Sequence, residues 1–309
     1  TTLNHKTDKV NFFEKINENL ILLNESLIEY LKFGFSAENT VYYCMWPNNN
    51  RYTKVIPHAY LIYDYMDELD LLESNHDELK HQHSVLLEKA NLITVSAQKL
   101  YESIDEKYRE KILLLPNAVD LDFVSKIEDT QNIPNEIRLI KNNYKRIVGY
   151  YGAIAPWVDF DLIEYLLQQN KSDFYLFIGP VFDTSEKVAY LLNNYENILF
   201  IKEMPREKII SYLKNFDKCI IPFIKNNITD SVSPVKVYEY LAAGKDVVST
   251  NILECEKIQY IDVSNNKEEF SKNLQLSLKH KKDIIKNYVL ENLWSKRVEK
   301  ILEFMEKKK

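Results

Sequence analysis

Residues 231–250 read Ser-Val-Ser-Pro-Val-Lys-Val-Tyr-Glu-Tyr-Leu-Ala-Ala-Gly-Lys-Asp-Val-Val-Ser-Thr, a polar loop that leads into a helix and then a strand. Pro234 suits the first turn of that helix, and Gly244 suits the residue after its end. The unpaired N–H groups and the dipole at the helix start favour an anion such as a diphosphate. Lys236 would lie near that end, and Glu239 could accept hydrogen bonds from two sugar hydroxyls. The same pattern also fits a plain helix–strand unit without a ligand.

The loop–helix–strand pattern recurs on both sides of this segment. Strands that alternate with helices predict a parallel sheet with right-handed crossovers. The expected strands are 147–151, 174–178, 198–201, 219–222, 247–250 and 259–261, and the expected helices are 162–169, 186–193, 206–213 and 234–243. A final helix is expected over 286–305.

The first part of the chain is less regular. Apolar residues at a spacing of three to four predict one amphipathic helix over 11–33. Short strands are expected at 41–46, 60–63, 92–95 and 112–115, with a helix at 78–90 and Ser96 as the cap of another. The polar stretch 122–143 is interpreted as a linker, with a helix within it at 136–141.

Length and composition exclude several classes of protein. A chain of 309 residues with 45% hydrophobic residues predicts about two globular domains. The net charge of −6 argues against a protein built to bind nucleic acid. Three cysteines without a Cys-x-x-Cys pair argue against a disulfide scaffold or a cysteine zinc site. We expect no transmembrane segment and no signal peptide, and the missing initiator Met suggests a larger polypeptide context.

The 234–248 element resembles one found in the nucleotide-sugar glycosyltransferases of the GT-B fold, in the GT4-like group called glycosyl transferases group 1. That group carries a Pro-x-Lys-x-(Tyr/Phe)-Glu-Tyr-Leu-Ala-x-Gly-Lys-Pro-Val-Val element. Here Pro234, Lys236, Glu239 and Gly244 match it, and Asp246 stands where proline is usual.

Further stretches resemble the same group in the same order. They are Ala-Asn-Leu-Ile-Thr-Val-Ser at 90–96, Leu-Pro-Asn-Ala-Val-Asp at 115–120, Gly-Tyr-Tyr-Gly-Ala at 149–153, Phe-Ile-Gly-Pro at 177–180, Ile-Pro-Phe at 221–223 and Lys-Glu-Met at 202–204. The resemblance covers about residues 60–250, and 294–297 suits the terminal helix.

The resemblance implies an α/β protein of the GT-B fold, with two Rossmann-like domains facing a cleft. We place the N-terminal, acceptor-side domain at 1–140 and the nucleotide-sugar domain at 141–285, with residues 286–309 returning to the first domain. No opening strand and Gly-rich turn precede Val41, so the N-terminal domain is expected to be incomplete and its sheet smaller. The implied donor-binding residues are Gly152, Ala153, Ser233, Pro234, Val235, Lys236 and Glu239, with Lys202, Glu203 and Met204 in the loop beside the base.

The implied activity is a hexosyltransferase, of the retaining type, that moves a sugar from a nucleotide-diphosphate sugar to a glycan, lipid-linked or protein acceptor. The setting would be bacterial surface polysaccharide or glycoconjugate synthesis, in the cytoplasm or at the inner face of the membrane, with peripheral membrane contact. The alternatives are a non-catalytic binding or assembly module and a GT-B sugar-nucleotide epimerase. Released nucleoside diphosphate distinguishes an active transferase from a binding module.

Three departures from the family pattern concern the donor site. Relatives often carry an acidic residue eight positions before the helix glutamate, where this chain has Ser231, with Asp230 one residue out of register. An Arg/Lys pair after the first βα loop is replaced by Ala-Pro-Trp-Val at 155–158, and Ala118 replaces a usual Gly. The phosphate charge is therefore expected to be balanced by Lys236 and backbone N–H groups.

Catalytic candidates come from the end of an early strand, where family members often place a histidine. The matching residues here are Asp64 and Asp67, which could act on the acceptor hydroxyl, with His58 as an outside candidate. The competing interpretation of Asp67 is a helix cap with no catalytic role.

No metal or other cofactor is expected. Asp159 and Asp161 resemble a metal-binding Asp-x-Asp pair, but their place at a helix start suits capping. His76, His81 and His83 lack the i,i+4 spacing of a helical metal site and are expected to be solvated.

Overall fold

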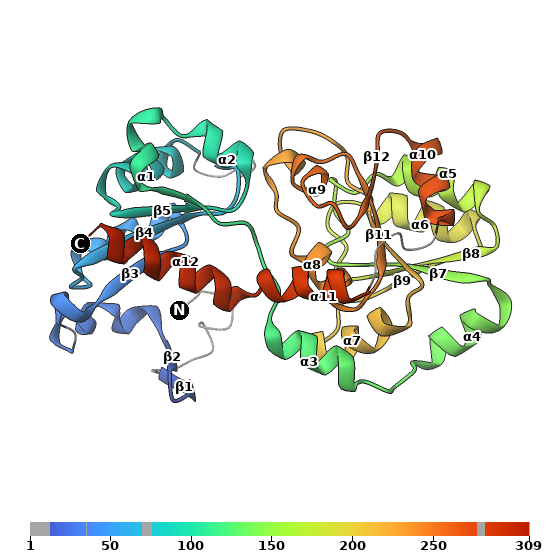
Figure 1. Ribbon diagram of the computed structural model, residues 1–309, viewed down its shortest axis with the longest axis horizontal. Helices are drawn as coiled ribbons and strands as arrows, with labels where there is room; N and C mark the ends of the chain where they lie inside the picture. Colours follow the sequence, from blue (N-terminus) through green and yellow to red (C-terminus); the bar gives the residue numbers. More distant parts are fainter. Residues whose placement is uncertain (1–12, 35, 70–75, 277–281, 309) are drawn as a thin grey trace. The chain divides into compact units, whose positions relative to one another are not determined.

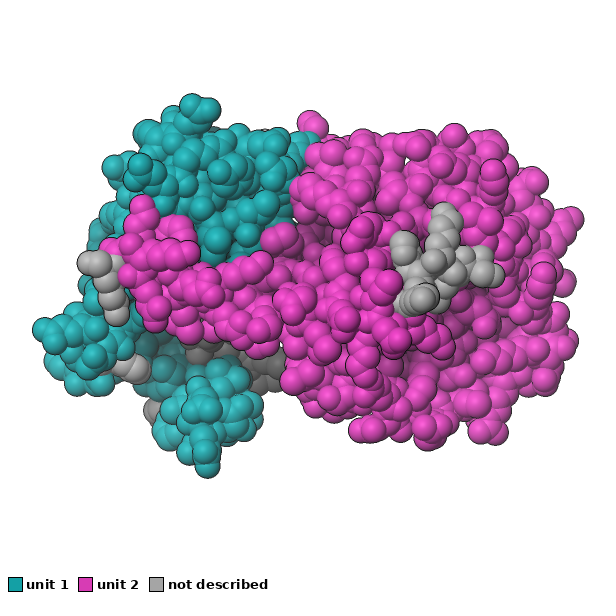
Figure 2. All heavy atoms as spheres, viewed as in Figure 1, with its two compact units in different colours: residues 1–115 teal, residues 116–309 magenta. Residues whose placement is uncertain are grey.

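The computed structural model describes residues 13–34, 36–69, 76–276 and 282–308. It divides into two compact units, residues 1–115 and 116–309, which are coloured teal and magenta in Figure 2. The boundary therefore falls at Leu115/Pro116 rather than at 140/141, and 286–309 groups with the second unit. The return of the last helix to the first domain stays a prediction.

Unit 1 contains a parallel four-stranded sheet in the order β3-β4-β5-β6 (Figure 1). The strands are β3 (Val41–Cys44), β4 (Tyr60–Tyr65), β5 (Leu92–Val95) and β6 (Ile112–Leu114). Among its described residues, unit 1 also contains the α-helices α1 (His76–Lys89) and α2 (Gln98–Ser103) and the 3-10 helices η2 (Glu25–Phe33), η3 (Ala37–Asn39), η4 (Pro47–Lys54) and η6 (Glu106–Lys111). Tyr63, Leu86 and Ile93 are fully buried in its core.

Unit 2 contains a parallel six-stranded sheet in the order β12-β11-β10-β7-β8-β9. The strands are β7 (Arg146–Tyr151), β8 (Asp173–Ile178), β9 (Ile198–Ile201), β10 (Lys218–Ile221), β11 (Asp246–Thr250) and β12 (Asp262–Ser264). The strand order reverses beside β7, which is the kind of place where open α/β sheets bind ligands. Within the described residues, the sheet of unit 1 is smaller, as predicted.

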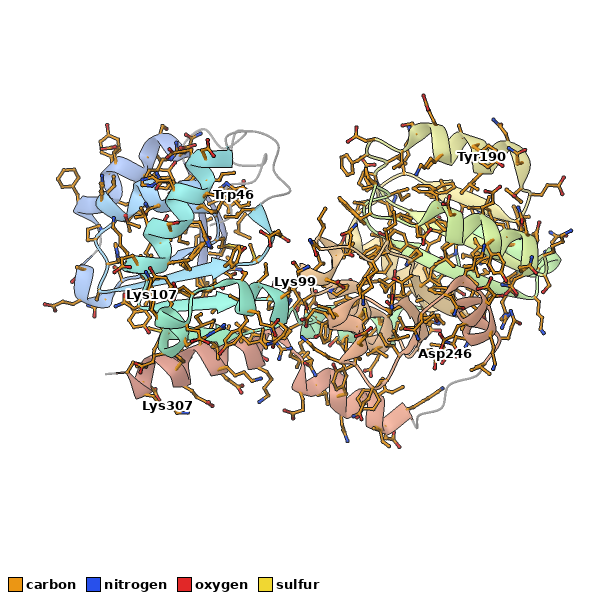
Figure 3. All side chains as sticks on the ribbon, turned by 90° about the horizontal axis from the view of Figure 1, so that it is seen from above. Trp46, Lys99, Lys107, Tyr190, Asp246 and Lys307 are labelled. Carbon is orange, nitrogen blue, oxygen red and sulfur yellow. The ribbon has the colours of Figure 1, made fainter. Side chains whose placement is uncertain are left out.

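Helices cover both faces of the unit 2 sheet. The helices of unit 2 are α3 (Leu121–Asp129), α4 (Asn135–Asn143), α5 (Phe160–Gln169), α6 (Ser185–Asn194), α7 (Arg206–Asn215), α8 (Val235–Ala242), α9 (Leu253–Glu256), α10 (Lys267–Gln275), α11 (Lys282–Glu291) and α12 (Trp294–Lys307), with the 3-10 helix η7 (Thr229–Ser231). Figure 1 shows α5, α6 and α10 on one side and α3, α4 and α7 on the other. Figure 3 shows the side chains of unit 2 filling the space between sheet and helices.

The helix predicted over 11–33 is wrong for the residues that are described. Residues 13–23 form an antiparallel hairpin of β1 (Phe13–Asn17) and β2 (Leu20–Leu23), and η2 follows; residues 11 and 12 lie outside the description. The Asn17 side chain accepts from the N–H of Asn19 in the turn, and Asn24 caps η2 through the N–H of Ser26. These asparagine turns interrupt an apolar spacing that also fits a helix.

The linker predicted over 122–143 is also wrong, because α3 and α4 occupy most of it, although the helix expected within it at 136–141 is confirmed by α4. Asp120 caps α3, and Phe123, Ile127, Ile137 and Ile140 are buried in the core of unit 2. The polar residues that suggested a linker belong to the outer faces of two amphipathic helices.

Four smaller expectations also need correction. The final helix is two helices, α11 and α12, and the last strand lies at Asp262–Ser264 rather than 259–261. Ser96 donates to the carbonyl of Met66 and does not cap α2. His83 is packed rather than solvated: it contacts the Tyr63 hydroxyl at 2.7 Å, and burial lowers its pKa to about 4.

Arg297 fixes the start of unit 2. Its buried guanidinium donates to the carbonyls of Pro116 and Asn117, at 2.7 and 3.1 Å, and to the Asn292 side chain at 2.7 Å. Val119 adds two backbone hydrogen bonds at the junction of α11 and α12, which explains the break between those helices. Residues 116–119 therefore belong with unit 2.

We predict that Arg297→Met lowers the free energy of unfolding of unit 2 by roughly 2–4 kcal/mol, because it removes a buried charge-assisted donor from several acceptors. Arg297→Lys should recover only part of the loss, since an ammonium cannot reproduce the planar fork of donors. Urea denaturation of the whole chain measures the change. The matched control is the neighbouring Lys296→Met, whose ion pair with Glu299 is solvent-exposed and should matter little. Equal stability of the Arg297→Met variant and the parent would contradict this role.

Candidate functional site

The loop before α8 is held in place by Asn117, which lies at the start of unit 2. Ser233 accepts a hydrogen bond from the N–H of Asn117 at 3.1 Å, and its carbonyl accepts from the Asn117 amide at 2.6 Å. Pro234 caps α8 without any side-chain hydrogen bond to the helix. The first N–H groups of a helix have no partner within the helix, so Val235 and Lys236 offer theirs to an anion.

Lys236 brings a positive charge to this helix start. Its ammonium lies 5.4 Å from the ring centre of Tyr150 and 5.2 Å from that of Phe223. Burial lowers the pKa of the ammonium to about 8, although the charge of Glu239 acts in the opposite direction. Aromatic faces stabilise a cation only in part, so a bound anion would supply charge compensation that the protein leaves incomplete.

Glycines allow the lysine to lie on the backbone of the β7–α5 loop. A Cβ on Gly152, which has a φ of 127°, would lie 3.0 Å from the Lys236 Cε and 3.2 Å from its Nζ. A Cβ on Gly179, with a φ of 152°, would lie 2.1 Å from the carbonyl oxygen of Gly152. Both positions therefore require glycine, for their φ angles and for the close approach of their neighbours.

Glu239 is buried one turn along α8 from Lys236. Its carboxylate accepts a hydrogen bond from the Tyr151 hydroxyl and forms an ion pair with Arg206, the first residue of α7. The Arg206 guanidinium also lies 4.6 Å above the ring of Phe123. A carboxylate has about four acceptor positions, so these two partners orient Glu239 and still leave room for hydroxyl donors.

The comparisons with known proteins point to one class. No protein-family model matches the chain. TuaH of Bacillus subtilis, named as a teichuronic acid biosynthesis glycosyltransferase, is 26% identical over 177 residues. That match covers 56% of this chain and 44% of TuaH, so the chain spans less than half of that relative.

Solved structures match most of the chain. A mutant of S. aureus TarM in complex with fondaparinux, α-GlcNAc-glycerol and UDP has a TM-score of 0.62 at 13% identity, covering 92% of this chain and 59% of TarM. Anabaena HepE in complex with UDP-glucose has a TM-score of 0.61 at 12% identity, covering 86% of this chain and 78% of HepE. These neighbours are GT-B glycosyltransferases. The chain has the GT-B fold.

In this GT-B chain, unit 2 brings together the predicted donor-site residues on α8 and the β7–α5 loop. The Lys236 side chain lies against Gly152, and Lys236 itself follows the loop that contains Ser233. The carbonyl of Ala153 accepts a hydrogen bond from the Tyr150 hydroxyl at 2.8 Å. Lys202, Glu203 and Met204 occupy the loop between β9 and α7, separated from Arg206 by Pro205 alone. Because Arg206 pairs with Glu239, this loop leads to the carboxylate.

Sequence reasoning missed four residues of the site: Arg206, Tyr151, Asn117 and Arg297. An arginine at the first position of a helix opposes the helix dipole, which was a detectable signal that Arg206 has a specific partner. The other three depend on contacts between segments far apart in the chain. Their roles follow only from the structure.

The position that carries an acid in many GT-B relatives has a different role here. Ser231 is fully buried and donates to the carbonyl of Asn227 at 2.9 Å. Asp230 accepts from the N–H of Leu253, the first residue of α9, at 3.1 Å. The motif's Lys245 is also structural, since it donates to the carbonyls of Lys214 and Phe216 at the end of α7.

The catalytic candidates lie in unit 1. Asp64, on β4, accepts hydrogen bonds from Thr94 at 2.6 Å and from Tyr43 at 2.9 Å. Burial raises the pKa of Asp64 and also that of Asp67. His58 contacts the carbonyl of Ile56 at 2.7 Å. The catalytic assignment of Asp64 and Asp67 stays a prediction.

Asp159 has the capping role that competed with metal binding. Its carboxylate accepts from the N–H of Leu162 at 2.9 Å, and Asp161 lies in the first turn of α5. Among the side chains that the structure describes, no three His, Cys, Asp or Glu residues gather as metal ligands would. Likewise, none of the described helices is both long and apolar enough to cross a membrane.

The pH dependence of stability tests the buried state of Lys236. Its pKa is lower in the folded protein than in the unfolded chain, so the unfolded chain binds more protons above about pH 8. The stability of the parent relative to Lys236→Met should therefore rise from about pH 8 toward pH 10, by at most roughly 1.4 kcal/mol per pH unit. Urea denaturation at each pH measures it.

Lys236→Arg is the matched control for this measurement. A guanidinium stays charged over this range, so its stability relative to Lys236→Met should not change with pH. A flat profile for the parent as well would show that the Lys236 ammonium is hydrated like a surface lysine.

Proposed function

We propose that the chain binds a nucleotide-diphosphate sugar at unit 2 and transfers its sugar to a hydroxyl acceptor in cell-surface polysaccharide synthesis. The observation that carries the proposal is the Lys236 ammonium, incompletely compensated at the start of α8 and in contact with Gly152. The name of TuaH supports a glycosyltransferase of surface polysaccharide synthesis. The UDP and UDP-glucose bound to TarM and HepE support a uridine nucleotide as the donor.

Residues along α8 would bind different parts of the nucleotide sugar. The diphosphate would accept hydrogen bonds from the N–H groups of Val235 and Lys236 and pair with the Lys236 ammonium. Such fixed donors stabilise the charge that develops on a departing diphosphate. The ribose hydroxyls would donate to Glu239, which Tyr151 and Arg206 orient, and the base would lie beside Lys202, Glu203 and Met204.

The finer assignment follows the resemblance of the 234–248 element. We infer a hexosyltransferase of the retaining type that needs no metal ion, acting on a glycan, lipid-linked or protein acceptor. Asp64 or Asp67 would receive the proton of the acceptor hydroxyl, which suits carboxyl groups whose pKa is raised by burial. The glycosyl transfer would take place in the cytoplasm, at the inner face of the membrane.

Calorimetry with uridine, UDP and UDP-glucose tests the donor site. Glu239→Ala should weaken binding of all three by roughly 1.5–3 kcal/mol, the range for a hydrogen bond to a charged group. Lys236→Ala should weaken UDP and UDP-glucose but leave uridine unchanged, because uridine carries no phosphate. Lys187→Ala is the control, since Lys187 is an exposed lysine over the Phe160 ring. If both site variants bind like the parent, the nucleotide site lies elsewhere.

Turnover separates the transferase from its alternatives. With UDP-glucose, UDP-galactose or UDP-N-acetylglucosamine and EDTA present, the parent should release UDP, and Lys236→Ala should release much less. Tight binding without UDP release in the presence of hydroxyl acceptors would favour a binding module. Ser231, which stands where relatives often carry an acid, is the observation that supports this alternative. Conversion of one sugar nucleotide into its epimer without UDP release would favour an epimerase.

A further inference from the structure

Large apolar side chains are exposed around the carboxyl ends of three strands of unit 2. We call Trp157, Val181, Phe182 and Ile224 the apolar rim. Their exposed fractions are 38%, 38%, 51% and 37%. They follow β7, β8 and β10, and parallel strands end at one edge of a sheet, where ligands of α/β proteins bind.

Backbone contacts tie the rim to the β7–α5 loop. The N–H of Ile224 donates to the carbonyl of Trp157 at 2.8 Å, and Val158 pairs with Phe223 in an antiparallel bridge. The N–H of Phe182 donates to the carbonyl of Ile154 at 2.9 Å. The backbone at Trp157 is therefore fixed while its side chain is partly exposed, which lowers the entropy of ordering this loop when a ligand binds.

Trp157 also adjoins the Lys236 site. Its indole interacts with the hydroxyl of Tyr150, whose ring lies 5.4 Å from the Lys236 ammonium. Phe223, the bridge partner of Val158, lies 5.2 Å from the same ammonium. The contacts thus lead from Glu239 to Lys236 and on to Trp157. This is the order ribose, diphosphate, sugar in a nucleotide sugar.

We propose that Trp157 is a platform for the transferred sugar, with one C–H face of the pyranose ring stacked on the indole. The proposal rests on the proposed donor site and adds the residue that contacts the sugar. The loop from 152 to 158 contains no charged residue, so an apolar surface meets the ring there. The C–H face of a sugar ring is its apolar side, and the rest of the rim would shield it from water.

Calorimetry with UDP and with UDP-glucose, UDP-galactose and UDP-N-acetylglucosamine tests the platform. For whichever sugar nucleotide binds the parent most tightly, Trp157→Ala should weaken binding roughly five- to tenfold, a magnitude typical of contacts with aromatic rings. It should change UDP affinity less than about twofold. Trp157→Phe, which keeps an aromatic ring, should recover most of the loss. Trp294→Ala is the matched control, because Trp294 is exposed to 41% but lies on α12.

The outcomes separate the platform from the donor site. Equal losses for UDP and the sugar nucleotide, or no loss for either, would overturn the platform and leave the proposed function intact. An absence of binding by the parent to UDP and to every sugar nucleotide would overturn the proposed function, and the platform with it.

Fluorescence gives a second test that does not depend on the folding of Trp157→Ala. The chain has three tryptophans, so Trp46→Phe combined with Trp294→Phe leaves Trp157 as the lone one. Its emission should change when the sugar nucleotide saturates the protein, and change less with UDP. An identical response to UDP and the sugar nucleotide would contradict direct contact with the sugar.

Discussion

The arrangement of the site depends on one close approach, between the side chain of Lys236 and the backbone of Gly152. The ammonium is partly withdrawn from water, faces two aromatic rings and has a pKa lowered by burial. This arrangement is costly without an anion, because aromatic faces replace only part of the lost hydration. It is also possible only because Gly152 and Gly179 allow two loops and a lysine to meet without Cβ atoms between them.

A second constraint acts on the carboxylate one turn along the same helix. Glu239 is held by Tyr151 and Arg206, from β7 and α7, so a single buried group links three elements of unit 2. At the start of α8, Asn117 contacts the loop that leads into the helix, and Arg297 in turn holds Asn117. The site is therefore positioned by contacts between segments distant in sequence, and a nucleotide would find its groups already oriented.

Sequence reasoning succeeded where local patterns determine the structure. The apolar strands predicted the parallel sheet of unit 2. Pro234 and Gly244 predicted the two ends of α8. It failed at residues 13–33, where asparagine turns compete with a helical spacing, and at 121–129, where outward-facing polar residues resembled a linker. Lys236 and Glu239 were predicted from the motif. Arg206 gave only the signal of a cation at a helix start, and its partner Glu239, like the contact of Asn117 with Ser233, follows only from the tertiary structure.

A crystal structure of the protein with UDP bound is the most direct test of the central claim, that the start of α8 is a diphosphate site. The account predicts phosphate oxygens within hydrogen-bonding distance of the N–H groups of Val235 and Lys236 and of the Lys236 ammonium. It also predicts ribose hydroxyls on Glu239. Bound UDP whose phosphates lie away from α8, with Lys236 still facing Tyr150 and Phe223 alone, would contradict it.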